Sequence, residues 1–472
     1  MLRFFRSSLP ARLIGLILLA LAIRLPLLWL GEVPLTLAEL RGWLVGERLH
    51  TGALPYRDVY DHTAPLAAVF YALLDVALPR SWVLYRLVAL LLVLVQAVRL
   101  SVVFNRYNVH PERGYLAALT YVLAASTSAE LDTLSPLLLG QTFVVFALSA
   151  LLPTSREGYD NTRLFRAGFL LGLAALCYLP LSLLLLMGLF AVVSFAANSF
   201  RSFLLLLCGF GFPYAVVATA LLYLNALPDF RQFHLEPMLA GAAAADALPR
   251  AVQLKLLALP GLLLVLALAR TFTTSLGLVF QIKFQQLMLV WLVAAVLIGG
   301  VVGGSAPGLL AVALPPLAYF GLFLWQQTRR GWISEVLLVL VLGSVVVVRY
   351  RSLLGIENLW PLPAEARYAA RPDARYAAVQ GQRVLVLGPS RGVYVHNQAA
   401  TPYVDWRLAQ RDFGRLREYG AVFRVATKLA SPPPYLIDEA NLLPELRYKL
   451  PHIFGRYQPT ATPRVYRLGA DR

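Results

Sequence analysis

The chain has 472 residues, of which 59% are hydrophobic and only 14% charged, and its mean hydropathy is +0.66. A soluble globular protein is about 45–50% apolar and about 25% charged, so this composition excludes a soluble enzyme, a disordered chain and a coiled coil. Lys and Arg exceed Asp and Glu by 42 to 25, a formal net charge of +17. In a membrane protein such an excess indicates cytoplasmic loops and lipid headgroups, not nucleic acid. The two cysteines, Cys177 and Cys208, lie in apolar runs, which excludes a disulfide framework.

The apolar runs predict eleven membrane spans, since a helix needs about 20 apolar residues to cross about 30 Å of hydrocarbon. They lie near 11–30, 82–103, 114–129, 134–152, 165–179, 181–197, 202–224, 251–269, 285–302, 307–325 and 333–349. The first run lacks a small-x-small cleavage site behind it, so we expect it to remain as an anchor. A further run, 64–78, is only about 15 residues long and holds Asp75, which favours a helix in the membrane interface over a full span.

The distribution of Lys and Arg predicts the orientation. If 64–78 does not cross, the basic residues gather on the side of the N-terminus, in the loops 104–113, 153–166, 198–201, 270–284 and 326–332. The opposite turns near 130, 180 and 303–306 carry none, although the longer loop 225–250 holds Arg231 and Arg250. The pattern predicts a cytoplasmic N-terminus and an extracytoplasmic C-terminus.

Two long segments then lie outside the membrane. The first is the loop 31–81, part of a predicted transmembrane domain 1–350, and the second is the whole of 351–472. In the latter, strands are predicted at 383–388, 435–437 and 464–468 and helices at 406–419 and 441–454. Strands that alternate with helices predict a small α/β domain. The predicted fold class is therefore an all-α polytopic membrane domain followed by a C-terminal α/β domain.

The first external loop carries a dense group of titratable side chains. An amphipathic helix is predicted over 36–52, a Pro-Tyr turn follows it, and Asp58, Asp61 and His62 come next. Two carboxylates and a histidine could hold a divalent cation or act as acid and base. In the alternative interpretation the aspartates cap turns and His62 faces water.

A second acidic pair, Glu130 and Asp132, lies in the tight turn between the predicted third and fourth spans. Acidic groups at membrane depth are costly and are therefore functional candidates. Alternatively, Asp132 caps the helix that begins at Thr133. His234 and Glu236 in the loop 225–250 are further candidates to complete a cavity with the first loop.

The order of these features carries a resemblance. It comprises an N-terminal span, a long external loop with an interfacial helix, a Pro-Tyr turn, an acid before Pro-Leu, a short acidic turn, a glycine-containing span and an external α/β domain. This order resembles the GT-C fold of integral-membrane glycosyltransferases, and in pattern the protein O-mannosyltransferases and lipid A aminoarabinose transferases.

Individual motifs are similar to those of that family, with substitutions. Ala38-Glu39 followed by Gly52 keeps the spacing of the family's Asp-Glu and glycine, with Ala38 at the catalytic aspartate. The stretch 61–66, Asp-His-Thr-Ala-Pro-Leu, is similar to the family's Glu-Lys-Pro-Pro-Leu but one residue longer. GFLLGLAALCYLP at 168–180 is similar to the family's span ending Thr-Lys-Gly-Pro, with Tyr178 in place of the phosphate-binding lysine.

The resemblance implies an activity and a site. The expected substrate is a sugar carried on a polyprenyl phosphate, transferred to a protein or glycan of the bacterial envelope without a nucleotide cofactor. Because Ala38 cannot accept a proton, the catalytic carboxylate is expected to be Glu39, Asp61 or Asp132. The family's second-loop aspartate resembles Asp132 or Glu130. Donor binding is expected from Arg41, Arg57, His62, Glu130 and Tyr178.

The same resemblance implies a location, partners and cofactor needs. The protein is expected in the cytoplasmic (inner) membrane, with membrane lipids and the lipid-linked sugar as partners and no nucleic acid. No cofactor is required, and a divalent cation near Asp58, Asp61 and His62 stays an open alternative. A different class of function is also open, in which the chain is a non-catalytic lipid-binding or scaffold subunit for envelope assembly.

Overall fold

The chain folds as two compact units. The computed structural model describes residues 2–7, 9–30, 35–111, 113–152, 161–195, 200–240, 250–274, 278–301, 306–326, 331–351, 353–355, 370–400 and 402–469. The first unit comprises 1–33, 83–218 and 241–364, and the second comprises 34–82, 219–240 and 365–472. Most of the loop 31–81 therefore folds with the C-terminal domain that the sequence predicts after residue 350.

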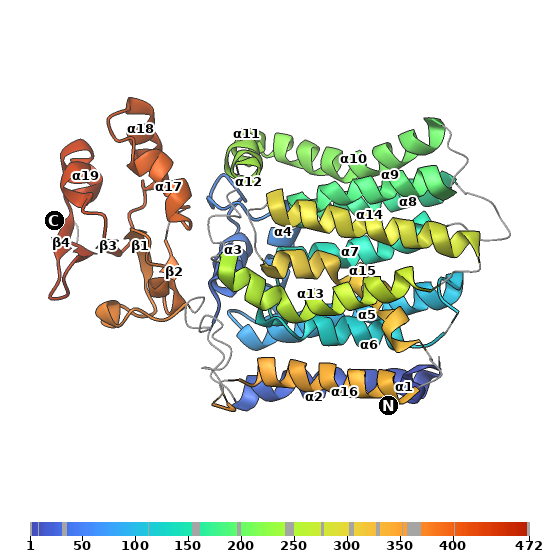
Figure 1. Cartoon of the computed structure of the whole chain (residues 1–472). Coiled ribbons are helices and arrows are strands. Elements are labelled where there is room, and N and C mark those ends of the chain that lie inside the picture. Colours follow the sequence, from blue (N-terminus) through green and yellow to red (C-terminus); the bar gives the residue numbers. More distant parts are fainter. Residues whose placement is uncertain are drawn as a thin grey trace. The chain divides into compact units, whose positions relative to one another are not determined.

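The first unit consists of helices (Figure 1). They are α1 (Leu2–Phe5), α2 (Pro10–Leu30), α5 (Trp82–Tyr107), α6 (Leu116–Ala125), η1 (Ala129–Asp132), α7 (Pro136–Leu151), α8 (Asn161–Cys177), η2 (Leu179–Leu184), α9 (Leu185–Phe195), α10 (Phe200–Tyr223), α13 (Arg250–Phe272), α14 (Val279–Val301), α15 (Ala306–Trp325) and α16 (Gly331–Arg349). Within the described ranges, seven helices are long and apolar enough to cross a membrane: α2, α5, α10, α13, α14, α15 and α16. The other four predicted spans contain the shorter helices α6, α7, α8 and α9, so a membrane protein is supported and the count of eleven stays a prediction.

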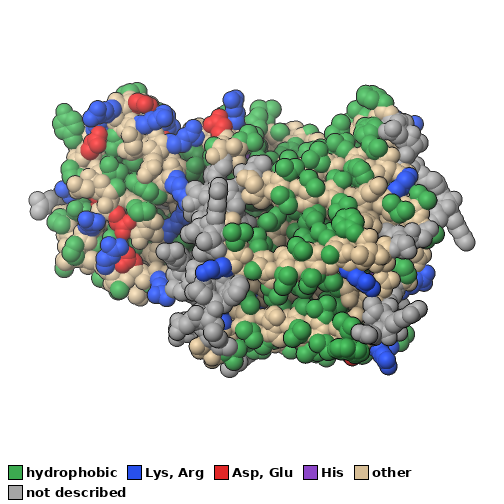
Figure 2. Space-filling model, in the orientation of Figure 1, with side chains coloured by type: hydrophobic (Ala, Val, Ile, Leu, Met, Phe, Trp, Pro, Cys, Tyr) green, Lys and Arg blue, Asp and Glu red, His purple; other side chains and the backbone are tan. Residues whose placement is uncertain are grey.

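Hydrophobic side chains cover both the inside and the outside of this unit. Helix α15 is the best buried of the seven, with Leu314, Tyr319 and Phe323 in the core. On the outside, Leu91 of α5 and Val265 of α13 are more than half exposed, and Figure 2 shows hydrophobic side chains along the helices. An apolar exterior of this extent is typical of helices that face lipid.

Helices α8 and α10 approach each other at glycines. A Cβ built on Gly168 would lie 2.1 Å from the carbonyl oxygen of Leu206, and one built on Gly209 would lie 2.2 Å from that of Phe165. By contrast, a Cβ on Gly211, in the same helix as Gly209, would meet no atom within 4 Å. Small residues at such crossings let helix backbones pack closely, which is how helices associate within lipid.

The second unit joins two helices of the first loop to a small α/β fold. Its helices are α3 (Leu37–His50), α4 (Pro65–Ala77), α11 (Leu227–Phe230), the π-helical turn η3 (Arg231–Leu235), α12 (Glu236–Leu239), the 3₁₀ turns η6 (Ala374–Tyr376) and η7 (Gly392–Val395), α17 (Trp406–Phe413), α18 (Tyr419–Lys428), α19 (Leu443–Lys449) and α20 (Pro451–Phe454). Its strands are β1 (Arg383–Leu387), β2 (Gln398–Ala399), β3 (Tyr435–Asp438), β4 (Tyr457–Pro459) and β5 (Val465–Leu468).

The five strands form one mixed sheet in the order β2-β1-β3-β5-β4. Strands β2 and β3 flank β1 and run parallel to it, whereas β5 is antiparallel to both β3 and β4. The chain leaves β1 first to one side and then returns to the other, so the carboxyl end of β1 is the point at which the strand order reverses. Ligands of open α/β sheets bind at such points.

The predicted elements of this domain agree with the structure at β1, β3 and β5. The predicted helix over 406–419 instead ends at Phe413, where Gly414 caps it, and α18 begins at Tyr419. The predicted helix over 441–454 divides at Pro451, whose ring removes a backbone donor. Strands β2 and β4, of two and three residues, are too short to show an alternating pattern.

Helix α4 is the predicted short helix of the first loop. It has 13 residues and is therefore about 20 Å long, too short to cross about 30 Å of hydrocarbon. It buries Tyr71 and Asp75, while Val69, Leu73 and Val76 are at least half exposed. Such an exposed apolar face suits a helix that lies in the membrane interface.

Candidate functional site

The carboxyl ends of β1 and β2 each place a charged residue at the same edge of the sheet. Arg391 follows β1, and Asp405 follows β2 as the N-cap of α17. The Asp405 Oδ1 atom accepts a hydrogen bond of 3.0 Å from the backbone N–H of Arg407, while its Oδ2 atom lies 3.2 Å from Arg391 Nη2. The cap fixes the carboxylate, whose second oxygen faces the Arg391 guanidinium.

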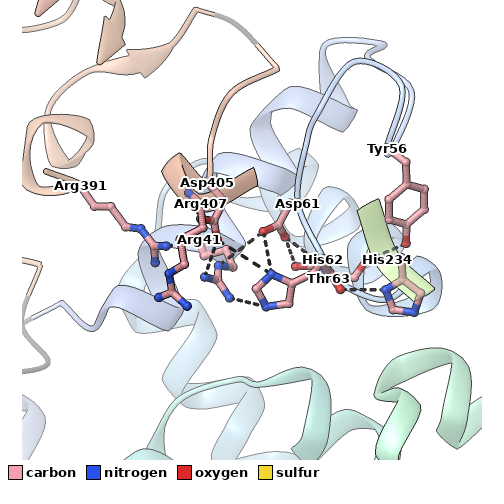
Figure 3. A network of polar contacts seen from close by, with 9 residues as sticks. All are labelled: Arg41, Tyr56, Asp61, His62, Thr63, His234, Arg391, Asp405 and Arg407. Carbon is pink, nitrogen blue, oxygen red and sulfur yellow. Dashed lines mark hydrogen bonds and ion pairs between the residues drawn. The ribbon is translucent and has the colours of Figure 1, made fainter. Parts of the chain in front are cut away.

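The first loop contributes three more side chains to this edge (Figure 3). Arg41 comes from the buried side of α3, and Asp61 and His62 from the segment before α4. The Arg41 guanidinium contacts all three neighbours: Nη2 lies 3.2 Å from Asp405 Oδ2, Nη1 lies 2.9 Å from His62 Nε2, and Nε lies 3.5 Å from Asp61 Oδ1. Arg41 therefore links the first loop to the sheet.

Two guanidinium groups meet at one carboxylate oxygen: those of Arg41 and Arg391 each lie 3.2 Å from Asp405 Oδ2. Arg407, whose backbone N–H binds the other oxygen of Asp405, is the third arginine of the cluster drawn in Figure 3. Asp61 and Asp405 are almost fully buried, with side chains 4% and 3% exposed, whereas Arg41 and Arg391 are partly exposed and Arg407 is exposed. The cluster therefore presents arginines toward solvent in front of buried carboxylates.

The protonation of His62 follows from its contact with Arg41. A guanidinium only donates hydrogen bonds, so His62 Nε2 accepts and Nδ1 carries the proton. Burial first, and the positive charge of Arg41 second, lower the pKa of His62 to about 4. His62 is thus neutral at pH 7, and its Nδ1 lies 3.9 Å from both Asp61 Oδ1 and Asp405 Oδ2.

Asp61 is ionised and retains an open oxygen. Burial raises the pKa of Asp61, but Arg41, His62 and the hydrogen bonds from Thr63 together outweigh it and hold the pKa below its usual value. Its Oδ2 atom accepts from the Thr63 backbone N–H at 3.1 Å and from the Thr63 hydroxyl. Its Oδ1 atom has no hydrogen bond among the described residues. A fixed, buried carboxylate whose Oδ1 lies 3.5 Å from Arg41 Nε but accepts no hydrogen bond there can accept a proton from a substrate.

A segment from elsewhere in the chain holds the first loop in place. His234, in the π-helical turn, lies with Nδ1 2.8 Å from the carbonyl oxygen of His62, and the ring of Phe230 stacks on it at 5.1 Å. The Tyr56 hydroxyl donates a 2.7 Å hydrogen bond to the Thr63 carbonyl. Burial lowers the pKa of His234 to about 4. Residue 234, a candidate from the sequence, therefore contacts the backbone of the cluster.

Asp61, His62 and Asp405 form a buried group that is close enough to bind a metal ion, because one ligand atom of each lies within 4.8 Å of the others. The sequence predicts a candidate cation site formed by Asp58, Asp61 and His62. In the structure Asp58 instead accepts a 3.1 Å hydrogen bond from Leu54 N–H and lies 3.5 Å from Lys428 Nζ. Asp58 therefore closes its turn, and Asp405 is the second carboxylate of the group.

Glu39 and Arg57 lie in the second unit but have other contacts. Glu39 is fully buried and forms a capping box with Thr36: its carboxylate accepts from Thr36 N–H at 2.8 Å, and the Thr36 hydroxyl accepts from Glu39 N–H at 3.1 Å. Ala38, at the position of the family's catalytic aspartate, is exposed on the first turn of α3. Arg57 lies in the exposed turn, with Nη1 3.5 Å from the Leu224 carbonyl oxygen.

Glu130, Asp132 and Tyr178 belong to the first unit. Asp132 pairs with two arginines, at 3.3 Å from Arg24 Nη1 and 2.7 Å from Arg349 Nη2. Glu130 is exposed in η1, and Tyr178 is partly buried just before η2. Two ion pairs on one carboxylate are typical of a structural role at the end of three helices. These three residues thus belong to the first unit, whereas Asp61 belongs to the second.

An apolar cavity of about 620 Å³ lies between α13 and α16 in the first unit. Its walls include Leu256, Leu259, Leu262, Leu340 and Val347. Thr127, Lys255 and Arg351 also line it, near the start of α13 and after the end of α16. The cavity thus combines apolar walls with two basic side chains, which suits an anionic lipid.

No protein-family model, no curated protein and no solved structure matches the chain. Arg391, Asp405 and Arg407 are the cluster residues that the sequence analysis missed. A signal for Asp405 was present, because an acid directly before the amphipathic segment from Trp406 is typical of an N-cap. No pattern in the neighbouring sequence indicates that the side chain of Asp405 contacts Arg41.

Proposed function

We propose that the chain is a GT-C-like membrane glycosyltransferase that uses a polyprenyl-phosphate-linked sugar as donor, on the extracytoplasmic face of the cytoplasmic membrane. One observation carries the proposal: the cluster combines the ionised Asp61 with the guanidinium groups of Arg41 and Arg391. A planar guanidinium matches the oxygens of a phosphate, and a carboxylate matches the proton of an acceptor hydroxyl.

The charges of the cluster favour an anionic substrate. Asp61 and Asp405 carry two negative charges, His62 is neutral, and Arg41, Arg391 and Arg407 carry three positive charges. The surplus positive charge lies on the partly exposed arginines, where a phosphodiester can reach it. A bound phosphate would also raise the pKa of Asp61 and so make it a stronger base.

The proposed reaction is a direct displacement. The acceptor hydroxyl attacks the anomeric carbon, and its proton passes to Oδ1 of Asp61. The bond between the anomeric carbon and the phosphate oxygen breaks, and the polyprenyl phosphate leaves with the bonding electron pair. Arg41 and Arg391 stabilise the charge that develops on that phosphate. Within the first unit, the cavity between α13 and α16 is a separate indication that the chain binds lipid, since its walls suit an isoprenoid chain.

A divalent cation has no step in this reaction. The donor atoms of Asp61, His62 and Asp405 fit a cation in type and spacing. However, the guanidinium of Arg41 contacts all three residues, and Arg41 and Arg391 together already neutralise the two carboxylates. A cation would have to displace Arg41, so the proposed reaction relies on arginine rather than on a metal.

The test uses the purified full chain in lipid nanodiscs with radiolabelled mannose, glucose or aminoarabinose on a polyprenyl phosphate. Asp61→Asn should lower sugar release or transfer by about 10²-fold or more, as expected when a general base is lost. Asp58→Asn is the matched control, because Asp58 lies in the same loop and only closes its turn. Glu39→Gln tests a second predicted carboxylate and should retain activity, since glutamine also forms capping boxes. Asp132→Asn tests the third, and its activity is compared per folded molecule, because the amide removes the anion that pairs with Arg24 and Arg349.

Two results would contradict the proposal. Full activity of Asp61→Asn would leave the reaction without this base, and loss of activity in Glu39→Gln would transfer the role to Glu39. If polyprenyl phosphate binds but no donor releases its sugar, the chain is the lipid-binding or scaffold subunit of the alternative prediction.

A further inference from the structure

A second group of arginines lies in the first unit, far along the bundle from Asp132. Helix α7 begins near Asp132, and the arginine group lies where α7 ends, α5 ends and α8 begins. There a cavity of about 430 Å³ is lined by Arg99, Arg106, Tyr107, Ser149, Ala150, Arg163 and Arg166. Four of its seven lining residues are arginines, and the proposed function assigns none of them.

Two of these arginines are held in fixed positions. Arg99 Nη2 donates a 2.7 Å hydrogen bond to the Ser149 hydroxyl, and its guanidinium lies 5.2 Å from the ring centre of Phe146. Arg163 Nη2 donates to the Tyr107 hydroxyl at 2.8 Å and to the Ser149 carbonyl at 3.0 Å. Both side chains are thus oriented toward the cavity by three helices, and a preorganised site binds an anion at lower entropic cost.

Three of the four cavity arginines, Arg99, Arg106 and Arg166, have no acidic partner among the described residues. No Asp or Glu described there forms an ion pair with Arg99, Arg106 or Arg166, and the buried Nε of Arg99 has no hydrogen-bond partner. Like charges that share one cavity repel each other, and a bound anion removes this repulsion. Arg106 and Arg166 are exposed, so the cavity is accessible from outside.

We propose that this cavity binds the phosphate group of an anionic lipid headgroup. Several guanidinium groups around one cavity match a phosphate that carries two negative charges. The cavity opens at the end of apolar helices, where lipid headgroups lie, and its volume exceeds that of a phosphate ion, so a headgroup fits. The site is separate from the Asp61 cluster and does not depend on the proposed function.

The experiment measures lipid retention by native mass spectrometry of the full chain, with phosphatidic acid as probe and phosphatidylcholine as the zwitterionic control. The wild-type chain should retain phosphatidic acid in preference. Arg99→Gln, which removes charge-assisted hydrogen bonds, should lower retention about tenfold or more. Arg166→Gln should lower it in the same direction, and it forms no hydrogen bond within the described structure, so its loss leaves the packing intact.

Arg201→Gln is the matched control, because Arg201 is an exposed arginine on α10 outside the cavity, and it should retain the wild-type preference. Inorganic phosphate alone distinguishes the two sources of the anion: if it raises the unfolding temperature of the wild-type chain but not of Arg166→Gln, the site takes free phosphate as well. Equal retention of both lipids by the wild type, or an unchanged preference in both Arg99→Gln and Arg166→Gln, would overturn the proposal.

A double variant, Glu157→Gln with Asp160→Asn, tests whether an acidic side chain of the segment 153–160, which lies outside the described residues, occupies the cavity instead of a lipid. A preference for phosphatidic acid that appears only in that double variant would also overturn the proposal.

Discussion

The guanidinium of Arg41 contacts Asp61, His62 and Asp405, the same three residues that could bind a metal ion. A guanidinium has one positive charge and five fixed donors, whereas a divalent cation accepts lone pairs from the same three side chains. The two are therefore mutually exclusive at this site.

Removal of Arg41 should convert the group into a metal site. In Arg41→Ala, two buried carboxylates and a neutral histidine keep their spacing but lose a neutralising charge. Mn²⁺ should then raise the unfolding temperature of this variant, by an amount that grows with the logarithm of Mn²⁺ concentration. The wild type and the Arg57→Ala control should not respond, and the measurement is a thermal melt with and without the ion. An equal response of the wild type would show that the group binds metal with Arg41 present.

The buried histidines make stability depend on pH. The pKa values of His62 and His234 are lowered to about 4, chiefly by burial, while an unfolded histidine titrates near 6.5. Below about pH 6.5 the unfolded chain takes up protons that the folded chain does not, so stability is present above that pH and is lost as the pH falls toward about 4. We expect a lower unfolding temperature at about pH 5 than at about pH 7.5.

His234→Asn should reduce this pH dependence, because one of these two histidines is removed and asparagine can still donate to the His62 carbonyl. His396, which is exposed, serves as the control, and His396→Asn should keep the full dependence. Identical melts of the wild type at both pH values would contradict the buried, neutral state of these histidines.

Part of the candidate cluster could be predicted from the sequence. Arg41, Asp61 and His62 lie within one loop, and local pattern places them near each other. Asp405 lies 364 residues from Arg41 in the chain, and no periodicity indicates which loop a helix N-cap will meet. The same limit explains Asp58: its local spacing to Asp61 resembles a ligand pair, but its backbone turn takes its carboxylate away.

At the scale of the helix, a pair of glycines on α10 gives a matched test of close packing. Gly209→Ala would place a methyl group 2.2 Å from the Phe165 carbonyl oxygen, so α8 and α10 must separate, at a cost of about 1–3 kcal/mol. Gly211→Ala meets open space and should be neutral or stabilise by up to about 1 kcal/mol, since alanine favours a helix. The free energy of unfolding in detergent measures both, and equal values for the two variants would contradict the close approach.

The helices themselves were largely predictable. Each of the eleven predicted apolar runs contains a helix of the structure, because a long apolar run has few alternatives in lipid. Sequence pattern did not predict the short strands β2 and β4 or the end of α17 at Gly414, because these features depend on partners elsewhere in the domain. The crossing of α8 with α10 could not be predicted either, because a glycine in a helix does not show which helix it faces.

At the scale of the whole molecule, the prediction concerns the orientation of the chain in the membrane. The distribution of Arg and Lys predicts that residue 113 and residue 418 lie on opposite sides of the membrane, with 418 outside. Both side chains are exposed, so Arg113→Cys and Glu418→Cys are suitable reporters once the exposed Cys208 is replaced by alanine. A membrane-impermeant maleimide should label Glu418→Cys in intact cells and Arg113→Cys only after permeabilisation. Labelling of both positions under the same condition would overturn the predicted orientation.

The second unit is built from three stretches of chain, 34–82, 219–240 and 365–472, and this division has a consequence for biosynthesis. A ribosome delivers Arg41, Asp61 and His62 early and His234 halfway through, but Asp405 and Arg391 only in the last fifth of translation. Until then Arg41 and His62 of the nascent chain lack the contacts with Asp405 that they have in the complete structure. The cluster can therefore assemble only after nearly all of the helices have been synthesised, which ties the competence of the site to completion of the chain.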